Sequence, residues 1–193
     1  MLKTLIFDFD GTIADCKVLH QEGFRQAVLD QIPDAVFSDE DVEGRPTVEK
    51  IKILTTMGYK TNHTKLNDTK QLHTQLNLYR YITFNQELYD EMSRLSEKYS
   101  VCLATNATDA FIYRSLDILQ LNGIFDRVNT ATDFPAKPDN TMLTDCMKFT
   151  GSTPDSTAIF EDSPLGIACA HSTGAQVIEV TGVDDTIARM KLL

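Results

Sequence analysis

The chain has 193 residues, 42% of them hydrophobic, which is enough to pack the core of one domain or of a domain that carries a smaller insertion. Its formal net charge is -10, from 28 acidic and 18 basic side chains, and no Lys/Arg cluster could neutralise a nucleic-acid backbone, so no nucleic-acid partner is expected. The four cysteines are widely spaced, without a CxxC or Cys/His pattern, which argues against a zinc site.

The first element predicted along the chain is a buried strand within residues 2–9, because a short apolar run there ends at a turn at Gly11. Asp8 lies near the carboxyl end of this strand. No strand signal follows for many residues, and apolar positions recur instead at helical spacing. Helices are predicted over 18–32, 47–57 and 59–85, the third with Leu66, Leu72, Leu76, Tyr79 and Ile82 on one face, and a further helix through Leu88, Met92 and Leu95.

After Tyr99 the pattern changes to short β-prone runs separated by helical stretches. The runs lie at 101–104, 127–130, 157–160 and 176–180. Such alternation predicts parallel strands joined by crossover helices, and the first strand finds partners only in this region. We therefore expect an α/β fold, with a three-layer, Rossmann-like core and a parallel sheet formed by residues 1–15 and 85–193. A small α-helical domain, residues 16–84, would be inserted after the first strand.

The sequence around the end of the first strand carries the strongest chemical signal. It reads Asp8-Phe9-Asp10-Gly11-Thr12-Ile13-Ala14-Asp15. Carboxylates two residues apart on an extended chain point the same way, so Asp8 and Asp10 can share one reaction centre. Their repulsion calls for a hard divalent cation or a shared proton. The alternative, an acidic strand end followed by an ordinary turn, accounts poorly for the whole octet.

A hydrophobic strand followed by DxDGT resembles motif I of the haloacid dehalogenase-like hydrolase superfamily. The resemblance implies that Asp8 is a nucleophile that attacks phosphorus. It also implies that Asp10 protonates the leaving oxygen and later activates water. An aspartate two positions after the nucleophile favours phosphoryl transfer over dehalogenation.

Two later segments resemble motifs II and III of the same superfamily. In the first, Thr105 and Asn106 follow a strand, and the resemblance implies that they hold phosphate oxygens at a helix start. In the second, Lys137 precedes Pro138 and would neutralise the nucleophile and the phosphoryl group. A helix cap and a solvated lysine are the alternatives for each segment alone, but both segments follow predicted strands in the order that the family requires.

Glu161 and Asp162 follow another strand and resemble motif IV, which completes a magnesium site. The resemblance implies that Asp8 and Asp162 bind Mg²⁺ directly, that Glu161 acts directly or through water, and that Asp10 contributes its backbone carbonyl. A solvated acidic loop is the alternative, and the apolar strand immediately before the pair weakens it.

Within the superfamily, the chain resembles the group of β-phosphoglucomutase and the small sugar-phosphate or phosphoglycolate phosphatases. In that group the helical insertion is a cap, in which His20 and Arg45 would contact substrate. A surface position on a helix is the alternative for His20. The mutase loop has an arginine where this chain has Thr47, which argues against mutase activity.

The predicted function is that of a magnesium-dependent phosphatase that hydrolyses a small phosphate monoester through an aspartyl phosphate on Asp8. The alternatives are a β-phosphoglucomutase-like phosphomutase and a non-catalytic phospho-acceptor or binding module. No apolar run reaches membrane-spanning length and no export signal is present, so we expect a cytoplasmic protein without a membrane partner. The expected partner is a small phosphorylated metabolite, and the expected state is a monomer or weak dimer.

Overall fold

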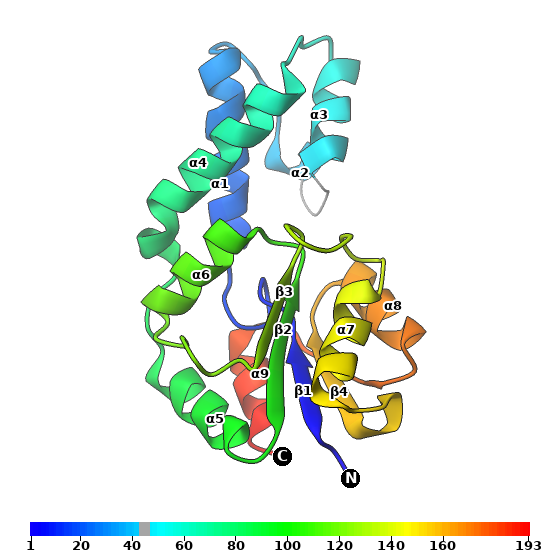
Figure 1. Cartoon of the computed structure of the whole chain (residues 1–193). Helices are drawn as coiled ribbons and strands as arrows, with labels where there is room; N and C mark the ends of the chain where they lie inside the picture. The colour runs from blue at the N-terminus through cyan, green and yellow to red at the C-terminus, as the bar shows by residue number, and fades with distance from the viewer. Residues whose placement is uncertain (43–46) are drawn as a thin grey trace. The chain divides into compact units, whose positions relative to one another are not determined.

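The computed structural model describes residues 1–42 and 47–193, which form two compact units (Figure 1). The core unit comprises Met1–Asp15 and Ile82–Leu193, and the helical unit comprises Cys16–Tyr81. The second boundary therefore lies between Tyr81 and Ile82, whereas the sequence placed it after residue 84. Within the described residues, no helix combines the length and the hydrophobicity that are needed to cross a bilayer.

The core unit contains a five-stranded parallel sheet with the order β3-β2-β1-β4-β5. The strands are β1 (Thr4–Phe7), β2 (Ser100–Thr105), β3 (Arg127–Thr130), β4 (Thr157–Glu161) and β5 (Gln176–Glu179). All side chains of β1 and β4 are buried, as expected for short, continuous apolar strands that are covered on both faces. The predicted α/β class is confirmed.

Helices cover both faces of the sheet and make three layers (Figure 1). One face carries α7 (Thr141–Thr150) and α8 (Pro164–Ser172), and the other carries α5 (Gln86–Ser96), α6 (Asp109–Ile118) and α9 (Val183–Met190). The short helix η1 (Pro154–Ser156) precedes β4. Because side chains alternate along a strand, Ile6 packs in the cluster of α7 and α8, whereas Phe7 points to the opposite face. There Phe7 stacks on Phe160, with ring centroids 4.4 Å apart.

The strand order determines where a site can form. The chain moves outward from β1 to β2 and β3, and then returns to place β4 on the other side of β1. Segments that leave β1 and β4 therefore diverge, and ligands of open α/β sheets typically bind at the carboxyl ends of strands where the order reverses in this way. Phe7 pairs with Phe160, and the Asp8 N–H donates to the Phe160 carbonyl at 3.0 Å. Asp8 and Glu161 consequently leave adjacent strands at the same level.

The helical unit contains α1 (Lys17–Gln31), α2 (Asp39–Val42), α3 (Thr47–Thr56) and α4 (His63–Tyr81). The short α2 was not predicted from the sequence, where four residues are too few to show a helical period. Apolar side chains from the unit's helices and loops form its own core, namely Phe24, Ala27, Val28, Phe37, Val42, Ile51, Leu54 and Leu66.

The apolar face predicted for α4 is confirmed at Leu66 and Ile82, which are buried, and wrong at its other three positions. Leu66 and Leu78 are buried, but Leu72, Leu76 and Tyr79 are 54%, 53% and 61% exposed. The buried face instead contains Lys70 and Thr74. The reason is a close approach to α1: a Cβ built on Gly23 would lie 2.6 Å from the Thr74 hydroxyl oxygen. Small groups at this contact let the two helices pack tightly, and this overrides the hydrophobic pattern of α4.

Replacing Gly23 tests this close contact. The Thr74 hydroxyl donates to the Lys70 carbonyl at 2.7 Å, so it is not free to move aside for a new methyl group. Alanine favours a helix over glycine by about 1 kcal/mol, yet overpacking costs about 1–3 kcal/mol. We therefore expect Gly23→Ala to lower the free energy of unfolding by up to about 2 kcal/mol, measured by thermal and urea denaturation.

The matched control removes the clashing atom. In a Thr74→Ala background, Gly23→Ala should be neutral or stabilising by up to about 1 kcal/mol, since only the gain in helix propensity remains. A Gly23→Ala protein that is more stable than the wild type would show that α1 and α4 do not pack as closely as described.

Candidate active site

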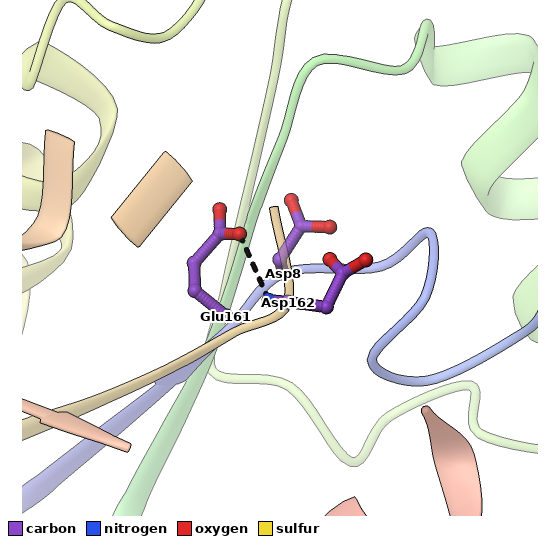
Figure 2. A group of neighbouring side chains, drawn as sticks. All are labelled: Asp8, Glu161 and Asp162. Carbon is purple, nitrogen blue, oxygen red and sulfur yellow. Dashed lines mark hydrogen bonds between the residues drawn. The ribbon is translucent and has the colours of Figure 1, made fainter. Parts of the chain in front are cut away.

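Three carboxylates meet at the carboxyl ends of β1 and β4 (Figure 2). Asp8 follows β1, Glu161 is the last residue of β4, and Asp162 comes next in the chain. One oxygen from each lies within 4.8 Å of the others. Three like charges at this spacing repel strongly, so the arrangement requires positive charge nearby.

Lys137 supplies one such charge from the loop between β3 and α7. Lys137 is only 5% exposed, and its ammonium lies 2.7 Å from Asp8 Oδ1 and 2.5 Å from Glu161 Oε1. Buried charges are tolerated when they are paired and hydrogen-bonded, and this lysine pairs with two carboxylates at once. The structure thus brings together Asp8, Lys137, Glu161 and Asp162, which the sequence places in three distant segments.

The second oxygen of Glu161 is held by groups at the start of α8. It accepts hydrogen bonds from the Asp162 N–H at 3.2 Å, the Ser163 N–H at 3.3 Å and the Ser163 hydroxyl at 3.2 Å. The first of these bonds is drawn in Figure 2. A Cβ on Gly166 would lie 2.0 Å from Glu161 Oε1, so glycine leaves the space that this carboxylate occupies. Glu161 is therefore fixed from both sides.

Sequence reasoning assigned no role to Ser163 or Gly166. A serine directly before Pro164 does predict a helix N-cap, and Ser163 accepts from the Gly166 N–H at 3.1 Å. No local pattern, however, shows that the same serine also donates to Glu161, or that Gly166 leaves room for the Glu161 carboxylate.

Gly11 allows Asp162 to approach the loop that follows β1. Its φ is +86°, and a Cβ there would lie 2.1 Å from Asp162 Oδ2. Any other residue would meet both backbone strain and a clash. The other oxygen, Asp162 Oδ1, is buried and has no hydrogen-bond partner among the described residues. A buried carboxylate oxygen without a donor is unusual and is typical of a site that binds a ligand.

Burial and mutual repulsion shift the ionisation of these groups. Burial raises the pKa of Asp8 to about 7, against the opposing charge of Lys137. Burial and the charge of Glu161 raise the pKa of Asp162 to about 6, and the charge of Asp10 contributes. Burial lowers the pKa of Lys137, but the charges of Asp8 and Glu161 outweigh it, so this pKa lies above its ordinary value. One lysine therefore only partly offsets the negative charge.

These residues fit a divalent metal ion. Asp8 and Asp162 present hard carboxylate oxygens, the donors that Mg²⁺ prefers, and no described residue donates a hydrogen bond to Asp162 Oδ1. Both oxygens of Glu161 already accept hydrogen bonds, which favours an orienting role for this side chain. Asp10 does not share the three-carboxylate group, although its charge acts on Asp162.

The two predicted phosphate-binding residues at the end of β2, Thr105 and Asn106, make different hydrogen bonds. Thr105 is 2% exposed, and its hydroxyl oxygen accepts from the Ala107 N–H at 3.2 Å. That bond leaves the hydroxyl proton available for a phosphate oxygen. The Asn106 side chain instead bonds to the backbone of Lys137.

The two predicted substrate contacts outside the core unit have no described place beside this cluster. His20 belongs to α1 of the helical unit, where its Nδ1 lies 3.4 Å from the Lys70 ammonium. Arg45 lies outside the residues that the structure describes. Contact of either side chain with a substrate stays a prediction.

Solved structures share the fold of the whole chain. A predicted phosphoglycolate phosphatase from Haemophilus somnus has a TM-score of 0.82 and 16% identity, covering 99% of this chain and 97% of that one. CbbY from Rhodobacter sphaeroides, solved with phosphate, has a TM-score of 0.75 and 17% identity, over 94% and 87% of the two chains. β-Phosphoglucomutase from Clostridium difficile has a TM-score of 0.75 and 16% identity, over 96% and 87%. At these identities the likeness establishes the fold.

Sequence comparison gives the family. No curated protein matches the chain significantly. The family model for haloacid dehalogenase-like hydrolases matches residues 5–180, which include all four motifs and the helical insertion. The chain therefore belongs to the haloacid dehalogenase-like hydrolase family.

Proposed function

We propose that the chain is a magnesium-dependent phosphatase that hydrolyses a small phosphate monoester through an aspartyl phosphate on Asp8. The observation that carries this proposal is the position of Asp8, which lies 2.7 Å from the Lys137 ammonium and in one group with the Asp162 carboxylate. A nucleophilic carboxylate needs nearby positive charge, because it must approach a phosphate that is itself an anion.

In the first step, an oxygen of Asp8 attacks phosphorus and the bond from phosphorus to the ester oxygen breaks. Asp10 gives its proton to the departing oxygen, so that an alcohol leaves instead of an alkoxide. Lys137 holds the attacking carboxylate and offsets charge on the phosphoryl group. The Thr105 hydroxyl at the end of β2 donates to a phosphate oxygen.

In the second step, water attacks phosphorus and the bond to the Asp8 oxygen breaks. Asp10, now a carboxylate, accepts a proton from that water, which releases inorganic phosphate and restores both side chains. The Asp8 and Asp162 carboxylates would hold Mg²⁺, with the Asp10 backbone carbonyl as a further oxygen donor. When bound, the metal ion supplies positive charge that stabilises the transferring phosphoryl group.

The helical unit has the role of a cap in this proposal, with His20 and Arg45 as candidate contacts to a small phosphorylated metabolite. The named structural neighbours include a predicted phosphoglycolate phosphatase and a β-phosphoglucomutase, and both names support a phosphorylated metabolite as substrate. Thr47, at the start of α3, stands where the mutase loop has an arginine. A positive side chain that could bind the second phosphate of a sugar bisphosphate is therefore missing at that position. Its absence favours transfer of the phosphoryl group from Asp8 to water.

Metal dependence is the first test. Phosphate release from a panel of phosphorylated metabolites should require Mg²⁺ and stop with EDTA. Mg²⁺ at about 100 times its dissociation constant should also stabilise the protein by roughly 2.7 kcal/mol, measured by thermal unfolding. Asp162→Asn should lose this stabilisation. Asp155→Asn, an exposed carboxylate of the same unit, should keep it. Full activity after verified metal removal would contradict the proposal.

The fate of the phosphoryl group separates a phosphatase from a mutase. With β-glucose 1-phosphate and a bisphosphate primer, we expect inorganic phosphate as the main product, because Thr47 replaces the arginine of the mutase loop. Phosphate and glucose 6-phosphate are measured in the same reaction. Rapid formation of glucose 6-phosphate with little phosphate release would instead support the mutase.

Replacing the two motif I carboxylates, Asp8 and Asp10, should impair different steps of the reaction. Asp8→Asn removes the nucleophile and should abolish both phosphate release and covalent labelling. Asp10→Asn keeps the nucleophile but loses the acid and base, which typically contribute 10²–10⁴-fold, so turnover should fall by about that factor. Labelling should persist with an ester that has a good leaving group. The acyl phosphate is trapped and mapped by mass spectrometry to the peptide that contains Asp8.

The controls for that experiment are the wild type and Asp15→Asn, which changes the last carboxylate of the same octet. Asp15→Asn should retain labelling on Asp8. Turnover by Asp8→Asn at the wild-type rate, or a label that maps reproducibly to another residue, would show that Asp8 is not the nucleophile.

A further inference from the structure

The backbone of Lys137 is held by a single side chain. Its N–H donates to Asn106 Oδ1 at 2.7 Å, and its carbonyl accepts from Asn106 Nδ2 at 3.3 Å. This reciprocal pair also fixes the orientation of the Asn106 amide. In a flipped side chain the NH₂ group would face the Lys137 N–H, and Oδ1 would face the Lys137 carbonyl oxygen. One asparagine thus satisfies both backbone hydrogen-bonding groups of one residue.

Lys137 needs such an anchor because it lies in the loop between β3 and α7, where no strand or helix holds its backbone. Its side chain has four rotatable bonds, and the ammonium must nevertheless reach Asp8 and Glu161 together. The two carboxylates fix one end of the side chain, and Asn106 fixes the other. A shift of the loop would move the ammonium away from at least one of its two partners.

We propose that Asn106 is a positioning residue that acts through Lys137, by fixing the backbone from which the ammonium reaches Asp8. This proposal rests on the proposed function, since the ammonium is assigned there to the phosphoryl-transfer step. It differs from the expectation that the Asn106 side chain binds phosphate, because the Oδ1 atom and one N–H of the amide already bond to the Lys137 backbone.

A double-mutant cycle distinguishes the two roles. Asn106→Ala should lower kcat about 10–100-fold and leave KM within a few-fold, because a displacement of about 1 Å in a catalytic group can cost 10²-fold. In a Lys137→Met background, Asn106→Ala should change kcat/KM by less than about 2-fold, since the group that it positions is gone. Equal losses in both backgrounds would show direct contact with the phosphate and overturn the proposal.

Hydrogen exchange at the Lys137 amide gives a readout that does not depend on turnover. Exchange followed by NMR should be at least about 10-fold faster in Asn106→Ala, because the amide loses its acceptor. Asn106→Asp keeps an oxygen for this amide and should retain most of the protection. Unchanged exchange of the Lys137 amide in Asn106→Ala would show that Asn106 does not hold this backbone. That conclusion would stand whether or not the protein is a phosphatase. Faster exchange without any activity in the wild type would refute the proposed function alone.

The Asn106 variants are expected to fold, because Asn106 is exposed and water can replace its hydrogen bonds. The matched control is Asn122→Ala, an exposed asparagine of the same unit whose side chain donates to Asp117 at 3.1 Å. It follows α6 and precedes β3, at the end of the sheet opposite the carboxylates. It should leave kcat and the exchange of the Lys137 amide unchanged. An equal effect of both variants would indicate a general loss of stability instead of positioning.

Discussion

The Lys137 ammonium lies between two buried carboxylates, 2.7 Å from Asp8 and 2.5 Å from Glu161. Removing either kind of charge would leave the other buried without compensation, which typically costs about 3–5 kcal/mol. The surroundings of this ion pair follow from that constraint. Gly166 leaves space for the Glu161 carboxylate, and Asn106 holds the backbone of the lysine. Glu161 and Lys137 therefore each depend on an uncharged neighbour for their position.

The strand order explains how distant segments reach this ion pair. Asp8 follows β1 and Glu161 ends β4, and these strands pair directly although the helical unit and two other strands separate them in the sequence. Parallel strands bring their carboxyl ends to one edge, and the reversal of strand order at β1 opens that edge to a ligand. The helical insertion leaves this pairing intact, because it occurs after β1 has ended.

Two features differ in how far local sequence could predict them. The central strands β1, β2 and β4 were predictable because each is a short, buried and mostly apolar run bounded by turns, a pattern with few other solutions. The buried face of α4 was not, because its contact with α1 depends on the small size of Gly23 beside Thr74 and not on hydrophobicity. A glycine within a helix indicates close packing only once its neighbour is known, and the neighbour is set by tertiary structure.

The sequence by itself determined the family, the α/β core and the identity of the acidic and basic residues, because motif spacing and hydrophobic runs are local properties that the fold preserves. The tertiary structure decided what each of these residues contacts. It placed the Asn106 amide on the Lys137 backbone, bonded both oxygens of Glu161, and left Asp162 Oδ1 without a donor in the part of the chain that the structure describes. These assignments depend on distances between segments far apart in the chain, and no local pattern encodes such distances.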